Sequence, residues 1–220
     1  MIQLKNVSKI YNGNGKPVFA LKQASMVIKK GEFIAITGPS GSGKSSLMNI
    51  LGMLDKPTEG EYYFENKDVN GLNENEMAGI RNRKIGFVFQ KFHLLPKTTA
   101  VENVELPLLY SEKKNIRKYA IGALEQVGLS DRTTHRANEL SGGQQQRVAI
   151  ARALVNEPEI IFADEPTGNL DFASGQEIMK IFQDLNSAGK TIVVITHDPA
   201  IAAYAKRTIH IHDGMITEKQ

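Results

Sequence analysis

The 220-residue chain contains no cysteine, which excludes disulfide bonds and cysteine-ligated metal sites. Neither sign of charge dominates, because 27 lysine and arginine residues face 24 aspartate and glutamate residues, for a net charge of +3. Nucleic-acid binding usually requires a concentrated basic face, so we expect no nucleic-acid partner. The 41% of hydrophobic residues is enough for one sizeable core.

Long apolar segments are also missing. The N-terminal residues MIQLKNVSK carry charges and lack the apolar region of a signal peptide. The longest apolar runs, such as TIVVIT at 191–196, have the length of a strand, whereas a membrane-spanning helix needs about 20 residues. We therefore expect another chain to cross the membrane if a membrane is involved.

Short β-rich runs alternate with turns in the first part of the chain. The pattern predicts strands over 2–11 and 18–37, the latter broken near Lys30–Gly31, with a turn over 12–17. It also predicts a β-rich run over 61–69 and a short buried strand over 85–90. Four leucine and isoleucine residues recur at helical spacing and predict one face of a buried helix: Leu47, Ile50, Leu51 and Leu54.

From Lys91 to Asn156 the patterns are mostly helical, which predicts a helical subdomain (91–156) inserted into a framework formed by 1–90 and 157–220. The later framework elements are predicted to be a strand over 159–165, a helix over 174–188, a strand over 191–196, a short helix after Asp198 and a hairpin over 208–217. Strands that alternate with helices indicate an α/β fold with a mainly parallel core sheet, and the N-terminal part indicates an antiparallel β flank.

The clearest chemical motif is GPSGSGKS at 38–45, which fits G-x-x-x-x-G-K-[ST] between a predicted strand and a predicted helix. Backbone N–H groups of such a loop surround nucleotide phosphates, Lys44 reaches the β and γ oxygens, and the Ser45 hydroxyl ligates Mg²⁺. An ordinary glycine-rich turn is the alternative. The predicted nucleotide-binding residues here are Gly38, Pro39, Ser40, Gly41, Ser42, Gly43, Lys44, Ser45 and Ser46.

Polar residues end or directly follow other predicted strands, where α/β proteins bind ligands. Asp164 is a candidate to hold the hydration shell of Mg²⁺, and Glu165 is a candidate general base for the attacking water. Gln90 is a candidate to ligate Mg²⁺ or orient water, and His197 to hydrogen-bond the γ-phosphate. The alternatives are a helix cap or a solvent-facing position for either acid alone, a surface position for Gln90 and a structural role for His197.

A second helix start with anion-binding character lies at LSGGQ, residues 140–144. Ser141 and Gln144 form a capping-box pattern, but capping does not explain two consecutive glycines, each of which costs about 0.5–1 kcal/mol relative to alanine. Close approach of a ligand to Gly142 and Gly143 explains them. The pattern from Ser174 to Glu177 is another capping box, so Asp171 is predicted to be free for a different contact.

In their order along essentially the whole chain, these motifs resemble those of the ATP-binding subunits of ABC transporters. The resemblance makes 38–45 the Walker A motif, Gln90 the Q-loop, 140–144 the signature, 160–165 the Walker B motif, 168–171 the D-loop and His197 the switch histidine. It implies ATP and Mg²⁺ as cofactors and ATP hydrolysis as the activity. It also makes Tyr11 the candidate aromatic that stacks on adenine, with an exposed strand tyrosine as the alternative. The D-loop carries Asn169 where small residues are common, and the contacts of Asn169 are left open.

Cassettes of this family pack head to tail, so the resemblance implies a homodimer that holds ATP between the Lys44 loop of one copy and the signature turn of its mate. Two anion-binding helix starts in one chain are then explained, because the second serves the neighbour's nucleotide. The residues that this adds to the predicted ATP site are Ser141, Gly142, Gly143, Gln144 and Asp171.

The segments FVFQKFHLLPKTTAVENVELPLLY and ADEPTGNLD are similar to the subgroup of macrolide-export and lipoprotein-release systems. This implies a separate membrane permease as partner, a peripheral position on the cytoplasmic side of the cell membrane, and a role in export or mechanical transmission. A cell-division or signalling ATPase that pulls on a membrane partner is the alternative. Part of an apolar set after Gln90 is expected to receive a permease helix, with internal packing as the alternative: Phe92, Leu94, Leu95, Leu106, Leu108 and Leu109.

Overall fold

The computed structural model describes residues 1–12 and 16–219, so the middle of the predicted turn over 12–17 lies outside the described residues. The chain forms two compact units, one made of Met1–Arg81 with Thr191–Gln220 and the other of Asn82–Lys190. The predicted helical block over 91–156 lies within the second unit, and its boundaries as a subdomain stay a prediction.

The first unit contains an antiparallel sheet with the strand order β2-β1-β4-β5. Its strands are β1 (Ile2–Asn12), β2 (Pro17–Ile28), β4 (Glu59–Phe64) and β5 (Lys67–Asp68). This sheet confirms the predicted antiparallel flank. The predicted β-rich run over 61–69 consists of two strands, because Glu65 and Asn66 take positive φ angles of 50° and 64° and turn the chain back into β5.

The same unit holds a parallel arrangement around β3 (Phe33–Thr37). β3 pairs in parallel with β8 (Thr191–Ile195) on one side and with β9 (Arg207–His212) on the other. β9 and β10 (Met215–Lys219) form the predicted C-terminal hairpin. Because β3 and β8 are almost entirely buried, their apolar runs are explained by burial on both faces. The loop at residues 38–43 therefore begins at the carboxyl end of a central strand.

The first unit contains the helices α1 (Lys44–Leu51) and α7 (Pro199–Ala202) and most of α2 (Glu74–Lys84), whose last residues belong to the second unit. Three of the four predicted apolar residues of α1 are buried, but the helix ends at a C-cap on Gly52 and leaves Leu54 47% exposed. Helix α2 was not predicted, because Met77 is its one buried residue and no apolar stripe marks it. Its start shows a reciprocal pair of bonds between Asn73 and Glu76, at 2.9 and 3.0 Å.

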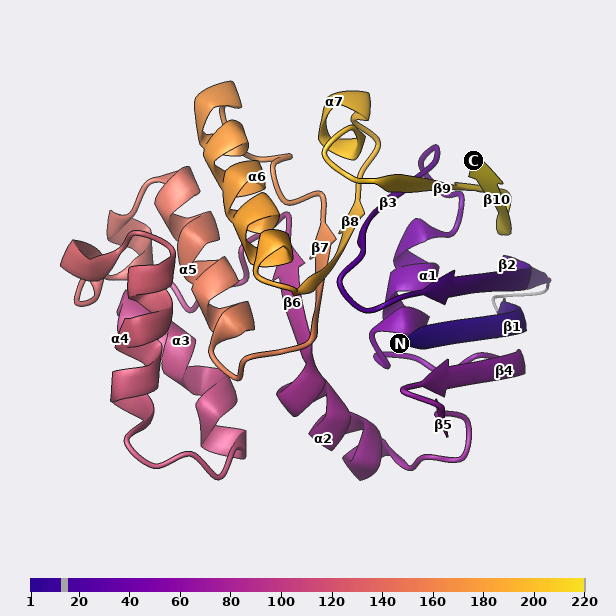
Figure 1. The fold of residues 1–220 in the computed structure, drawn as a ribbon, viewed down its shortest axis with the longest axis horizontal. Helices are drawn as coiled ribbons and strands as arrows, with labels where there is room; N and C mark the ends of the chain where they lie inside the picture. The colour runs from indigo at the N-terminus through magenta and orange to yellow at the C-terminus, as the bar shows by residue number, and fades with distance from the viewer. Residues whose placement is uncertain (13–15, 220) are drawn as a thin grey trace. The chain divides into compact units, whose positions relative to one another are not determined.

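The second unit contains the parallel strands β6 (Ile85–Phe89) and β7 (Ile160–Asp164), as predicted. Residues 91–156, all of which the structure describes, hold helices and no strand. The elements are α3 (Ala100–Glu105), η1 (Leu106–Tyr110), α4 (Ile116–Gln126), η2 (Ser130–Arg132), η3 (Ala137–Glu139) and α5 (Gly142–Leu154). Helices α3, α4 and α5 pack together (Figure 1), and α6 (Phe172–Ser187) follows β7.

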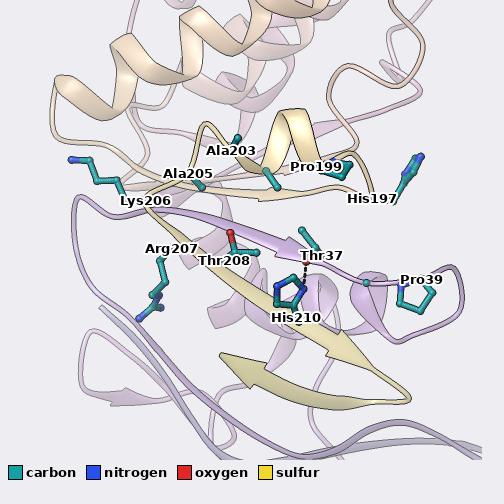
Figure 2. Close-up of a pocket in the computed structure, with 12 residues that line it drawn as sticks. Thr37, Pro39, His197, Pro199, Ala203, Ala205, Lys206, Arg207, Thr208 and His210 are labelled. Carbon is teal, nitrogen blue, oxygen red and sulfur yellow. Dashed lines mark hydrogen bonds between the residues drawn. The ribbon is translucent and has the colours of Figure 1, made fainter. Parts of the chain in front are cut away.

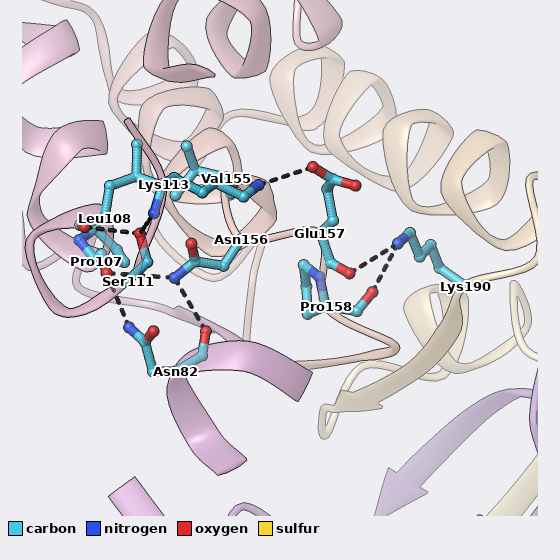
Figure 3. Close-up of polar contacts among 10 residues, drawn as sticks. All are labelled: Asn82, Pro107, Leu108, Ser111, Lys113, Val155, Asn156, Glu157, Pro158 and Lys190. Carbon is cyan, nitrogen blue, oxygen red and sulfur yellow. Dashed lines mark hydrogen bonds and ion pairs between the residues drawn. The ribbon is translucent and has the colours of Figure 1, made fainter. Parts of the chain in front are cut away.

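A polar network fixes the segment that leads from α5 into β7 (Figure 3). Asn156 Nδ2 donates to the carbonyl oxygens of Asn82 at 3.0 Å and Pro107 at 3.3 Å. Lys113 Nζ pairs with Glu157 Oε1 at 2.8 Å and thereby lowers the pKa of this glutamate. Lys190 Nζ donates to the carbonyl oxygen of Pro158 at 2.7 Å. These bonds hold the start of β7 in place, and β7 ends at the predicted acidic pair.

Candidate functional site

The loop between β3 and α1 is shaped by the contacts of its glycines with other backbone segments of the same unit. A Cβ on Gly38 would lie 2.1 Å from the carbonyl oxygen of Ile211, and a Cβ on Gly43 would lie 2.3 Å from that of Ala20. Gly41 has a φ of +77° but no atom within 4 Å of the position of a Cβ. The fold itself thus demands glycine at 38 and 43, and phosphate approach is not the whole reason for the motif.

Lys44 begins α1, and its side chain turns back over the loop. Its Nζ donates to the carbonyl oxygens of Gly38 at 2.8 Å and Pro39 at 2.7 Å. Both acceptors are neutral, so these bonds fix the ammonium group without cancelling its charge. Ser42 Oγ is buried and has no hydrogen-bond partner within the described part of the chain, and Ser45 is exposed. A fixed cation at a glycine-lined helix start fits a bound phosphate group.

A cavity of about 940 Å³ lies beside the start of this loop. Thr37, Gly38 and Pro39 line it together with the exposed His197. In Figure 2, His197 stands at one end of the cavity and Lys206 at the other. The structure therefore brings the predicted histidine to a cavity that the phosphate loop also lines.

Tyr11, near the end of β1, is 39% exposed and is held by its hydroxyl group. Tyr11 Oη donates to Asp55 Oδ2 at 2.9 Å, and Lys9 Nζ donates to Asp55 Oδ1 at 2.6 Å. Partial burial alone would raise the pKa of Asp55. The hydrogen bonds from Lys9 and Tyr11, with that from the N–H of Lys56, outweigh this effect, so the pKa of Asp55 is lowered below its ordinary value. Asp55 was not among the predicted site residues, because its position in a turn gave no sign of a contact with Tyr11.

In the second unit, Asp164 and Glu165 are half-buried at the end of β7. Glu165 has a φ of +44°, a conformation that costs a residue other than glycine about 1–3 kcal/mol and that clusters at functional sites. The fully buried Gln146 of α5 donates from Nε2 to the carbonyl oxygen of Pro166 at 2.6 Å and to that of Phe89 at 3.4 Å. Gln146 thus ties together the residues next to Glu165 and Gln90.

Gln146 was not predicted as a site residue. A signal was present, since Gly143, Gln146 and Ile150 have the spacing of one helix face and all three are buried. A polar side chain on a buried face must find hydrogen-bond partners. Gln90 itself is exposed directly after β6, and its side chain lies against Gly168 and Asn169.

The signature turn has the predicted capping box. Ser141 Oγ accepts from the N–H of Gln144 at 3.3 Å, and Gln144 Oε1 accepts from the N–H of Ser141 at 3.0 Å. A Cβ on Gly143 would lie 3.0 Å from Ser174 Oγ, whereas the closest atom to one on Gly142 is at 3.4 Å. Packing against Ser174 of α6 therefore gives Gly143 a reason within the fold, and the ligand explanation is stronger for Gly142.

Asp171 is not free for another contact, contrary to the prediction. It is the N-cap of α6, with Oδ1 accepting from the N–H of Ser174 at 3.0 Å and Oδ2 accepting from Ser174 Oγ at 2.6 Å. The hydroxyl and backbone N–H of Ser174 lower the pKa of Asp171. Helix α6 begins at Phe172 instead of Ser174, buries Ile178 and Phe182, and leaves Ile181 and Leu185 half-buried.

The apolar set after Gln90 divides between packing and exposure. Leu108 is 1% exposed, whereas Leu95 is 47% and Leu109 is 63% exposed. The backbone here is held by Arg152, whose guanidinium donates to the carbonyl oxygens of Phe92 at 2.8 Å and His93 at 2.6 Å. Because their side chains are exposed, Leu95 and Leu109 are available for contact with a partner.

A family model described as ABC transporter matches residues 21–168, more than half of the chain. The chain belongs to the ABC transporter family. Relatives of this cassette cover almost all of it: the uncharacterised ABC transporter ATP-binding protein YvrO of Bacillus subtilis is 53% identical over 97% of the cassette and 94% of its own length.

Two further comparisons concern the subgroup and the fold. The macrolide export ATP-binding/permease protein MacB of Chlorobaculum tepidum is 51% identical over 99% of this chain, which spans 34% of MacB. A dimeric structure of the ATP-binding cassette MJ0796, in a post-hydrolysis state bound to ADP and Pi, matches with a TM-score of 0.92 at 49% identity and covers 100% of this chain and 98% of that one. MJ0796 comes from Methanocaldococcus jannaschii. These findings confirm the predicted family, the α/β cassette fold and the function as the ATPase subunit of an ABC transporter.

The predicted site residues of the cassette fall in both units. Tyr11, the loop at 38–46 and His197 belong to the first, whereas Gln90, the acidic pair, the signature turn and Asp171 belong to the second. Among the described residues, no helix combines the length and apolar character needed to cross a membrane.

Proposed function

We propose that two copies of this cassette hold ATP between them and hydrolyse it to drive a membrane permease. The observation that carries the proposal is the presence of two phosphate-suited helix starts in one chain, at Lys44 with its fixed ammonium group and at the exposed Ser141. One bound nucleotide needs a single cradle of this kind, so the second suits the nucleotide of a mate. The dimeric MJ0796 cassette with ADP and Pi supports this arrangement.

The site residues divide the work. The loop at 38–46 holds the phosphates, Tyr11 packs on the adenine, and the turn at Ser141 and Gly142 acts on the nucleotide of the mate. Mg²⁺ supplies charge neutralisation at the phosphates when it is bound, and the residues proposed to hold it are Ser45, Gln90 and Asp164. Glu165 accepts a proton from the attacking water, and His197 hydrogen-bonds the γ-phosphate.

Light scattering after gel filtration tests the shared site. Glu165→Gln should hydrolyse ATP about 10²–10⁴-fold more slowly, since a general base is lost, and should accumulate as a dimer with ATP and Mg²⁺. Ser141→Arg in the same background should bind ATP and stay monomeric, whereas Lys44→Ala should not bind ATP. A Glu165→Gln protein that binds ATP and remains monomeric would show that the nucleotide is not shared.

The cassette is proposed to bind the cytoplasmic face of the permease. Leu95 and Leu109 are proposed to belong to the surface of the cassette that makes this contact. The supporting observations are the exposure of these leucines and the name of the relative MacB, an ATP-binding/permease protein. Co-purification with the permease should be lost when both leucines are replaced by alanine. Leu54→Ala is a matched control, because Leu54 is as exposed as Leu95 at 47% but is not one of the apolar residues after Gln90. Equal recovery with all variants would place the permease elsewhere.

A further inference from the structure

Gln90 and Asn169 form a paired amide contact within the second unit. Asn169 Nδ2 donates to the backbone carbonyl oxygen of Gln90 at 2.9 Å, and Gln90 Nε2 donates to Asn169 Oδ1 at 3.4 Å. A Cβ on Gly168 would lie 2.6 Å from Gln90 Nε2 and 3.2 Å from its Cδ. The side chain of Gln90 therefore lies directly against the backbone of residue 168, and any larger residue there would make the carboxamide move.

We propose that Asn169 is a positioning residue that holds Gln90 and sets the direction of its carboxamide group. The final torsion of a glutamine side chain is broad, so a solvated carboxamide exchanges the places of its nitrogen and oxygen easily. With Nε2 bonded to Asn169, the oxygen Oε1 is the carboxamide atom that faces away from Asn169. The inference rests on the proposed function, in which this oxygen of Gln90 holds Mg²⁺ or the attacking water.

Asn169 also lies beside the signature turn. The position of a Cβ on Gly142 is 3.9 Å from the backbone oxygen of Asn169 and 3.4 Å from Leu170 Cδ2. Two residues further on, Asp171 caps α6. The loop that holds Gln90 thus lies in ordinary contact with the turn at Gly142.

Side-chain amide resonances of the nucleotide-free protein test the contact without any catalysis. Loss of one pair of signals in Gln90→Ala assigns the Gln90 amide. Asn169→Ala, which removes both bonds, should shift this pair, and Asn169→Asp, which keeps an acceptor for Nε2, should shift it less. Asn138→Ala, at an exposed asparagine of η3, should leave it in place. An unchanged Gln90 signal in Asn169→Ala would overturn the proposal.

Steady-state hydrolysis tests the consequence. Asn169→Ala should lower kcat, by up to about 100-fold if a catalytic group is misplaced by an ångström, and should leave the KM for ATP nearly unchanged. In a Gln90→Ala background the same substitution should have no further effect, because the group it positions is gone. Losses that multiply in the double variant would show that Asn169 acts independently of Gln90. If the unmodified protein fails to hydrolyse ATP, the proposed function fails, and the amide signals still decide whether Asn169 holds Gln90.

Discussion

Replacing Gly43 by alanine should destabilise the nucleotide-free protein much more than replacing Gly41 in the same loop. At Gly41, with a φ of +77° and open space around it, alanine adds only the strain of a left-handed conformation, about 1–2 kcal/mol. At Gly43, with a φ of +108°, the new Cβ would lie 2.3 Å from the carbonyl oxygen of Ala20. A backbone segment must then move, which adds about 1–3 kcal/mol to the strain.

Urea and thermal unfolding, followed by circular dichroism without nucleotide, measure this difference. For a chain of this length, each 1 kcal/mol shifts the thermal midpoint by about 2–4 °C. Gly41→Ala should therefore lower the midpoint by roughly 2–8 °C and Gly43→Ala by roughly 4–20 °C. Because the chain has two compact units, a second probe such as tyrosine fluorescence must show the same transition before free energies are compared.

Gly31 provides the control for conformational strain. It shares the φ of +77° with Gly41 and likewise has no atom within 4 Å of a Cβ, but it lies outside the phosphate loop. Gly31→Ala and Gly41→Ala should cost about the same free energy of unfolding. If Gly43→Ala costs no more than these two variants, the contact with Ala20 does not shape the loop, and phosphate approach alone must explain the motif.

Three further outcomes are expected. Arg152→Leu should cost about 1.5–3 kcal/mol in urea unfolding, since it removes charged hydrogen bonds to two carbonyl oxygens, and should increase hydrogen exchange over residues 92–94. The lowered pKa of Asp171 gives stability that is present above the ordinary carboxylate pKa and is lost as the pH falls through the lowered value, so the midpoint of Asp171→Asn should depend less on pH in acid than that of the unmodified protein. Gly143→Ala should destabilise the protein by crowding Ser174, whereas Gly142→Ala should fold normally and, if a ligand approaches there, lose ATP-dependent dimerisation in the Glu165→Gln background.

Most strands could be predicted because their sequence pattern is strong. β3, β7 and β8 are short apolar runs bounded by turn residues, and their length and many β-branched residues distinguish them from buried helices. Elements whose signal is local hydrogen bonding were harder to find. Helix α2 buries Met77 alone, so the capping pair Asn73 and Glu76 is its main sequence signal. The end of α1 depends on a C-cap at Gly52, which the spacing of leucine residues does not reveal.

The error at Asp171 has a tertiary cause. Both Asp171 and Ser174 are good N-cap residues, and the sequence around them permits a helix start at either one. Ser174 packs against the position of Gly143 in α5, and its hydroxyl donates to Asp171, so it occupies the first turn and leaves the cap to the aspartate. This contact joins residues about thirty positions apart, and no local pattern contains it.

The two glycines of the signature turn differ in how strongly they indicate a ligand. Gly143 has a reason within the fold, because a Cβ there would lie 3.0 Å from Ser174 Oγ, so glycine at 143 is weaker evidence for a ligand than glycine at 142. Gly142 has neighbours only at ordinary contact distance, and a helix of an isolated chain would be more stable with alanine there. Gly142 is half-exposed and lies next to the loop that holds Gln90. The approach of a second molecule would explain why glycine stands there despite its cost in stability. The case for a shared nucleotide therefore depends on Gly142 and Ser141, and not on the glycine pair as such.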